Sequence, residues 1–246
     1  MQTNYADRYI DLTALGNCGD MMSMTSIETK HIIQKGFKNI TNPFIHHMAD
    51  KNSYSLGDEV TPIGAAFYIV PFVNATVRSG TEDEKKLVFE SMLQYKAFDK
   101  LPSTKRGHKP GDIEQLVSQA VRVATNVKTR QTKNLNSALE TLKNKIEKDN
   151  LLEHKVLMFL LKKGEVDKNI AGLVANKFMS EYQRPVCMLI YDEKSDTYSG
   201  SCRGCALAGI LDFKALCYET TLINWAIGHS NAFGMCISSS NINKFL

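Results

Sequence analysis

Apolar residues recur at helical spacing through the middle of the chain. From Asp112 to about Leu151 they return every three or four positions, which is the period of one face of an α-helix. The pattern predicts one long helix, and its many lysines and arginines favour a helix that connects two domains. Any single one of these charges is equally well explained by an ordinary solvated surface. The apolar positions are Ile113, Leu116, Val117, Ala120, Val121, Ala124, Leu135, Leu139, Leu142 and Ile146.

The residues before this helix are expected to be mainly helical. Thr61-Pro62 is a strong helix opening, because threonine caps free backbone amides and proline fits the first turn. Thr81 to Glu84 has the spacing of a capping box. Pro71 should kink or interrupt the helix expected over Ile63–Val73. The expected elements are a buried strand or helix start at Ile10–Leu15, a small-residue turn at Gly16–Asp20, a helix over Ser26–Lys35 stopped by Gly36, a break at Asn42-Pro43, a polar loop over Asp50–Glu59, and helices over Ile63–Val73 and Glu82–Phe98.

The pattern changes in the last third of the chain. Short apolar runs at Lys155–Leu161 and Val186–Tyr191 predict buried strands, and Asn169–Tyr182 between them has the pattern of a helix. A turn at Asp192–Asp196 should pair the second run with another strand over Tyr198–Arg203. This region is predicted to be a small α/β domain, and the loop over Asp99–Gly111 is expected to separate the helical region from the long helix.

Composition narrows the class of protein only slightly. With 246 residues, 43% of them hydrophobic, the chain can bury the core of one large domain or two modest ones. The chain has 30 Lys and Arg against 26 Asp and Glu, a formal charge of +4. This mild excess is compatible with a locally basic groove but does not by itself indicate a nucleic-acid partner.

No sequence feature indicates export or membrane insertion. The first nine residues are polar and include Asp7 and Arg8, unlike a signal peptide. The longest aliphatic runs are far below the roughly 20 residues needed to cross a bilayer. We therefore expect a cytoplasmic protein with no membrane partner and with reduced cysteines. Cys202-Arg-Gly-Cys205 resembles half of a zinc site, but a second pair at metal spacing does not accompany it.

A first candidate for chemistry is Asp20. The segment from Asp11 to Asp20 reads DLTALGNCGD and resembles the D-x-x-A-L-G-x-x-A-D segment of the RecJ-type branch of the DHH phosphoesterase family. The final aspartate of that segment is a metal ligand, so the resemblance implies that Asp20 binds Mn²⁺ or Mg²⁺, hard cations that prefer oxygen ligands. Without the family, an aspartate on a turn is usually an ordinary loop residue.

A second candidate is the pair Asn74 and Arg78. The segment from Val70 to Arg78 reads VPFVNATVR and is similar to the family's I-x-P-x-[IL]-N-A-x-x-R segment. If it is helical, the two side chains lie one turn apart and face the same way. An amide and a guanidinium so placed can hold a phosphate of a nucleic acid. The alternative is that Arg78 pairs with a nearby carboxylate such as Glu82.

Two further segments of the last third resemble the same family. Asn169–Lys177, followed by Arg184-Pro185, is similar to the family's G-[IL]-V-A-x-[RK]-L helix and R-P strand, and its small residues would let this helix pack closely on a sheet. Ser199–Gly204 and Gly228–Gly234 resemble the S-x-R and G-G-H-x-x-A-x-G elements of the DHH-associated domain, although Ile227 replaces the first glycine and Phe233 stands where alanine is common. The resemblance implies that nucleic acid contacts Ser201, Arg203, Gly228 and His229. Taken alone, His229 would be a solvated loop residue.

These segments follow one another in family order, and the resemblance extends from Asp7 to Phe245. It implies an α/β architecture with the C-terminal part of a DHH domain over 1–105, a connecting helix over 106–150 and a DHH-associated domain over 151–246. The family's H-x-x-D-x-D-G segment, a further aspartate and its Asp-His-His signature are missing, although two metals need them. His46-His47 lacks the preceding aspartate and follows Asp20, so both histidines are interpreted as surface residues. The sequence leaves open a fragment, a split gene product or a truncated viral homologue.

The resemblance implies the C-terminal part of a RecJ-like exonuclease. Such an enzyme removes nucleotides 5′ to 3′ from single-stranded DNA in recombination and repair. We expect this chain to bind single-stranded nucleic acid and to be inactive without the missing motifs, which an N-terminal partner fragment could supply. One alternative is a non-catalytic nucleic-acid-binding module or accessory subunit, and another is a small-substrate phosphoesterase of the same family.

Overall fold

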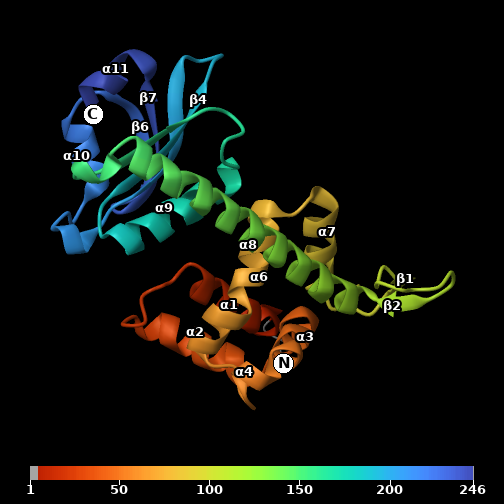
Figure 1. Cartoon of the computed structure of the whole chain (residues 1–246). Coiled ribbons are helices and arrows are strands. Elements are labelled where there is room, and N and C mark those ends of the chain that lie inside the picture. Colours follow the sequence, from red (N-terminus) through yellow and green to blue (C-terminus); the bar gives the residue numbers. More distant parts are fainter. Residues whose placement is uncertain (1–4, 246) are drawn as a thin grey trace. The chain divides into compact units, whose positions relative to one another are not determined.

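The computed structural model describes residues 5–245, which divide into two compact units (Figure 1). The first unit ends at Gln131 and the second begins at Thr132, so their boundary lies inside the predicted long helix. This helix, α8 (Leu116–Lys148), is confirmed and has 33 residues. It begins four residues later than Asp112 because Ile113–Gln115 forms β2, which pairs antiparallel with β1 (Lys100–Pro102). Of the loop expected over Asp99–Gly111, residues 100–102 form β1, and residues 103–111 are the predicted loop, which connects β1 to β2.

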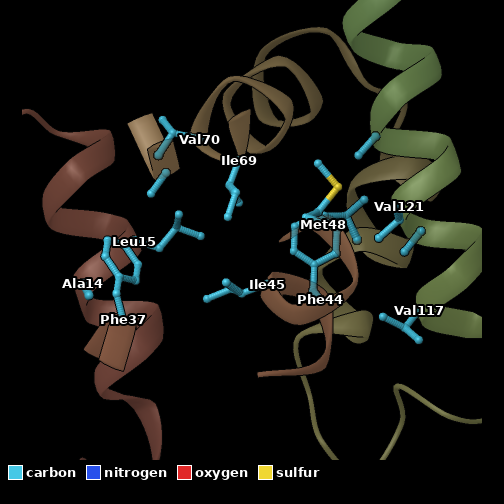
Figure 2. Close-up of a cluster of buried hydrophobic side chains, with 14 of the residues drawn as sticks. Ala14, Leu15, Phe37, Phe44, Ile45, Met48, Ile69, Val70, Val117 and Val121 are labelled. Carbon is cyan, nitrogen blue, oxygen red and sulfur yellow. The ribbon is translucent and has the colours of Figure 1, made fainter. Parts of the chain in front are cut away.

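The first unit is built from short helices around one core (Figure 2). Phe44, Ile45, Met48 and Ile69 are fully buried there, and the first turns of α8 contribute Val117. The elements are η1 (Tyr5–Tyr9), α1 (Ile10–Gly19), α2 (Ile27–Lys38), α3 (Pro43–Lys51), α4 (Ser53–Leu56), α5 (Pro62–Tyr68), α6 (Val70–Ser79) and α7 (Glu82–Ser91).

The helix signals of this unit are confirmed where a capping side chain carries them. The Thr61 hydroxyl accepts from the Gly64 amide, and α5 gives way to α6 at Ile69, with Pro71 in the first turn of α6. Thr81 and Glu84 form the predicted capping box. The helix that it opens ends at Ser91 rather than at Phe98, and residues 92–98 form turns.

Three local predictions for the first unit were wrong, and one was confirmed. Gly16–Asp20 is not a turn, because α1 continues to Gly19. Gly36 does not end its helix; a Cβ at this position would lie 2.6 Å from the Ile10 carbonyl oxygen, so the glycine lets α2 pack closely on α1. The break predicted at Asn42-Pro43 is confirmed, because α2 ends at Lys38 and the Asn42 side chain then caps α3 by accepting from two amides of its first turn. The polar segment Asp50–Glu59 includes the end of α3 and all of α4.

The second unit, coloured green to blue in Figure 1, contains a sheet. The sheet has five strands in the order β3-β4-β5-β7-β6. The predicted strands are confirmed as β3 (Leu157–Leu161), β4 (Val186–Asp192) and β5 (Thr197–Arg203), and the predicted helix as α9 (Lys168–Tyr182). β3 and β4 are parallel and β5 returns antiparallel through the expected turn. The chain then forms η3 (Ala206–Ala208), α10 (Phe213–Glu219), β6 (Ile223–His229), β7 (Ala232–Ser238) and α11 (Ser239–Phe245); a short turn, η2 (Leu151–Glu153), precedes β3.

Each face of this sheet has its own apolar core. On one face α9 packs on the sheet, where the rings of Phe159 and Phe178 stack with centroids 5.4 Å apart. On the other face Phe213 of α10 packs on residues of β5 and β7 that include Cys202 and Met235. The fold is therefore of the mixed α/β class that the sequence predicts.

The cysteines of the described chain are free thiols. Cys202 and Cys205 are both buried, and no group of three or more metal-binding side chains occurs in residues 5–245. Burial raises the pKa of the Cys217 thiol to about 12. The five buried cysteines, all in the second unit, act as small core residues. Over the same residues, no helix is long and apolar enough to span a membrane.

Candidate nucleic-acid interface and metal ligand

Three of the predicted site residues lie around one surface pocket of the first unit. Asp20, Asn74 and Arg78 line a hollow of about 440 Å³ between α1 and α6, together with apolar side chains such as Leu12 and Val73. Asp20 is exposed at the C-terminal end of α1, where its amide donates to the Gly16 carbonyl at 2.9 Å. The pocket therefore has a carboxylate, an amide and a guanidinium on its wall.

The short helix α6 sets the direction of Asn74 and Arg78. Ala75 and Thr76 are buried, while Asn74 is half-buried and Arg78 is exposed. Side chains four residues apart lie on the same face of a helix. Because Ala75 and Thr76 are buried on one face of α6, Asn74 and Arg78 point toward solvent on the other. The helical placement that the sequence predicts for Asn74 and Arg78 is confirmed.

The predicted alternative for Arg78 was an ion pair with Glu82. Instead, Glu82 pairs with Lys85 at 2.8 Å, and Glu84 pairs with Arg130 at 2.8 Å. Within residues 5–245, no carboxylate lies within 4.0 Å of the Arg78 guanidinium. An arginine held on a pocket wall without a carboxylate partner keeps its donors available to an anion.

The other aspartate of the same motif has a structural role. Asp11 is only 1% exposed, and its carboxylate accepts from the amides of Leu12, Thr41 and Asn42 at 2.7–2.8 Å. These bonds join the start of α1 to the start of α3. Asp20 is therefore the member of the motif that faces the pocket.

The donor set around Asp20 is too small for a two-metal centre built by this chain alone. In the described residues no three carboxylate, histidine or cysteine side chains converge. His46 and His47 belong to α3, where His46 pairs with Asp50 at 2.9 Å and His47 contacts the Pro43 carbonyl oxygen at 2.9 Å. Both histidines are occupied within their own helix, and neither lines the pocket of Asp20.

The other four predicted residues lie on the sheet of the second unit. Arg203 of β5 pairs with Ala232 of β7, which in turn pairs with His229 of β6. Residues that are paired across antiparallel strands share a face of the sheet, so Arg203 and His229 lie on the same face. Ser201 lies two residues before Arg203 and faces the same way.

Helix α9 leaves room for the Arg203 side chain at Gly172. A Cβ at Gly172 would lie 2.8 Å from Nη2 of Arg203 and 3.4 Å from the Ser201 hydroxyl. The guanidinium also donates through Nη1 to the Cys202 carbonyl at 2.8 Å. The small residues predicted to let this helix pack on the sheet thus include one that makes space for a candidate binding side chain.

Gly228 and His229 form the end of β6, and this end is fixed by residues that the sequence analysis did not single out. Asn231 donates to the Leu211 carbonyl at 2.9 Å and accepts from the Phe213 amide at 3.2 Å. Lys214 Nζ donates to the Gly228 carbonyl at 2.6 Å. Gly228 has a φ of +136°, and a Cβ there would lie 2.7 Å from the Ala232 carbonyl oxygen, so this position requires glycine. His229 is therefore the last residue of β6 rather than a loop residue, and it is exposed.

The two departures from the family pattern fall on opposite faces of this hairpin. Phe233 is buried against Phe213, with ring centroids 5.6 Å apart, and belongs to the core. Ile227 is 72% exposed on the face of Arg203 and His229. The departure at Ile227 therefore changes the face that carries the candidate residues, whereas the departure at Phe233 changes the core on the opposite face.

Arg184, from the R-P segment, has a structural partner set. Its guanidinium donates to the backbone carbonyls of Leu152 and His154, just before β3. This contact joins the start of β4 to the start of its parallel neighbour.

Comparison with known proteins shows relatives of the whole chain. No family model matches. A prophage-derived protein of Bacillus subtilis strain 168, YorK, and its counterpart in Bacillus phage SPbeta are each 32% identical over 251 aligned positions; both are named as single-strand DNA-specific exonucleases. The alignment covers 100% of this chain but 43% of each relative, so the chain spans less than half of their length.

Solved structures with the same fold include RecJ from Thermus thermophilus. The complex with Mn²⁺ matches with a TM-score of 0.68 and 18% identity, and the complex with Mg²⁺ with 0.65 and 16%. A third structure, the exonuclease RecJ bound to manganese, matches with a TM-score of 0.62. Each match covers 97% of this chain and 31–53% of the solved one.

Proposed function

We propose that this chain is the strand-binding, C-terminal part of a RecJ-like 5′-to-3′ exonuclease. The chain is a relative of single-strand DNA-specific exonucleases, and it has the fold of RecJ, a DHH-family protein. The observation that carries the proposal is the pocket in which Asp20, Asn74 and Arg78 meet. The Arg78 guanidinium has no carboxylate partner in residues 5–245, which leaves its donors available for a phosphate.

Each candidate residue has a role that its chemistry suits. The fork of donors on Arg78 and the amide of Asn74 would hold a phosphate in the first unit. In the second unit Ser201, Arg203 and His229 would contact the strand from one sheet face, and Gly228 would let the backbone approach it closely. None of these contacts reads base edges, so we expect binding to depend little on sequence.

Asp20 would be one ligand of a Mn²⁺ or Mg²⁺ site. When bound, two such ions supply a water for in-line attack on phosphorus and stabilise the leaving oxygen. The described residues do not fit a complete site, because Asp20 is the lone metal-type ligand of its pocket. We propose that the other ligands come from an N-terminal partner segment, and that the complete protein acts in DNA recombination and repair in the cytoplasm.

A non-catalytic nucleic-acid-binding module is the second candidate function. The observation that favours it is the same small donor set in residues 5–245. The two proposals share strand binding and differ in whether an added partner restores hydrolysis.

Strand binding is tested with a labelled single-stranded oligonucleotide at several salt concentrations. We expect affinity to fall as salt rises, because bound cationic side chains release counterions from phosphates. Arg78→Ala should lower the slope of log affinity against log salt by about 0.7, the value for one phosphate contact on a single strand. The melting temperature should change little, since Arg78 is exposed.

Arg106→Ala is the matched control, because Arg106 is an exposed arginine between β1 and β2 and does not line the pocket. It should leave both affinity and salt slope unchanged. An Arg78→Ala variant that binds as the wild type does would remove Arg78 from the interface. Salt-independent binding, or none at the lowest salt, would refute the proposed function.

A further inference from the structure

The sheet face that carries Arg203 and His229 continues into a second region with a different chemistry. Three rows of paired residues cross β5, β7 and β6 on this face, in that strand order. The rows are Arg203, Ala232 and His229; then Ser201, Gly234 and Ile227; then Ser199, Cys236 and Trp225. Trp225, the single tryptophan of the chain, thus lies two rows from the candidate phosphate contacts.

Trp225 is exposed on this face. Its side chain is on the same side of the sheet as Gly234, because a Cβ at Gly234 would lie 3.6 Å from Cζ3 of the indole ring. The residue as a whole is 41% exposed, whereas its neighbour Ala226, on the opposite face, is buried. A large aromatic side chain therefore lies beside a glycine and is partly exposed to solvent.

Most positions near the ring on this face carry small side chains, apart from Ile227. Helix α9 packs on β4 and β5, and beside it this face is built from residues such as Ser199, Ser201, Ala232 and Gly234. The three strands β5, β6 and β7 contain no aspartate or glutamate. The pocket that Ser199 and Ser201 line beside α9 also has two lysines and two aspartates on its wall, Lys163, Lys168, Asp167 and Asp192, so its charges balance. An anionic chain therefore meets no net negative charge there, and a base can lie on the indole.

We propose that Trp225 stacks on a base of the single strand whose backbone is held at Arg203 and His229. The inference rests on the proposed function and adds a base contact to its phosphate contacts. Four strand positions separate Trp225 from His229, about 13 Å at 3.3 Å per residue, so the contacts lie along one strand of nucleic acid rather than at one nucleotide. Aromatic stacking tolerates every base, since each has a π-face, and this suits a protein without sequence preference.

The test uses two strands of equal length, an oligothymidylate and an abasic strand that keeps the phosphates but has no bases. We expect the full chain to bind the oligothymidylate about tenfold more tightly, the effect of one stacked base. The emission of Trp225 should fall on binding the oligothymidylate and stay constant on binding the abasic strand. Because the chain has one tryptophan, this signal reports on that ring alone.

Trp225→Leu should reduce the preference for bases to near unity while it leaves affinity for the abasic strand unchanged. Trp225→Phe should keep most of the preference, since phenylalanine also stacks. Tyr54→Ala, which removes a fully exposed aromatic of α4, is the control and should change neither affinity. Melting temperatures of all variants show whether a loss of binding reflects unfolding.

The outcomes separate the two proposals. Equal affinity of the wild type for both strands, with salt dependence retained, would overturn stacking at Trp225 and leave the proposed function in place. An unchanged preference in a folded Trp225→Leu variant would also overturn it. Failure to bind either strand at low salt would overturn both.

Discussion

At the scale of single residues, Gly172 links packing to binding. It is an interior position of α9, where alanine is favoured over glycine by up to about 1 kcal/mol. The added methyl group would lie 2.8 Å from Nη2 of Arg203 and would displace the guanidinium. We therefore expect Gly172→Ala to raise the melting temperature and to weaken binding of single-stranded DNA about tenfold, the effect of one charge-assisted hydrogen bond of roughly 1.5 kcal/mol.

Asn176→Ala is the matched control, because it improves helix propensity at an exposed position of the same helix. It should stabilise the protein without changing DNA affinity. If Gly172→Ala binds DNA as tightly as Asn176→Ala does, the position of Arg203 does not matter for the strand.

At the scale of elements, one carboxylate joins the β1–β2 hairpin to the first turns of α8. Glu114 accepts two bonds of 2.6 Å from Arg122 and one of 3.0 Å from the Thr104 amide. The hydrogen bonds from Arg122 are the main cause that holds the pKa of Glu114 at about 2, below its ordinary 4.5. Because the folded-state pKa is the lower one, the ionised carboxylate stabilises the fold above pH 4.5, and this stability is lost as pH falls toward 2.

We expect Glu114→Gln to lower the free energy of unfolding at pH 7 by up to about 3 kcal/mol, the value of a shift of this size. The difference between wild type and variant should shrink as pH falls from 4.5 toward 2. Chemical unfolding at a series of pH values measures it. A difference that stays constant over that range would show that the ion pair does not supply the stability.

At the scale of the whole molecule, the described chain has two units with their own cores and one exposed metal-type ligand in the pocket of α1 and α6. We expect the pure chain not to degrade single-stranded DNA with Mn²⁺ or Mg²⁺, because one carboxylate cannot hold two metals in line with a phosphate. Asp20→Ala should leave this baseline unchanged. Metal-dependent degradation by the pure chain that Asp20→Ala abolishes would reveal further ligands within it.

The sequence by itself determined the features that local signals encode. Thr61 and Thr81 start helices through bonds to amides three residues away, and the apolar period over 116–148 predicts α8 without knowledge of any contact. The likeness to RecJ-type segments also came from short motifs, and the solved structures with the same fold include RecJ. Signals of this kind need only a few neighbouring residues.

The tertiary structure alone decided which distant residues meet. Gly36 has the appearance of a helix stop, but contact with α1 explains it, and Glu82 has the spacing to pair with Arg78 but pairs with Lys85 instead. The exposure of Trp225 beside Gly234 depends on β7 lying between β5 and β6. The sequence of a single strand does not contain this order. Strand order and face are set by packing among segments far apart in the chain, so no local pattern could predict that Trp225 shares a face with Arg203 and His229.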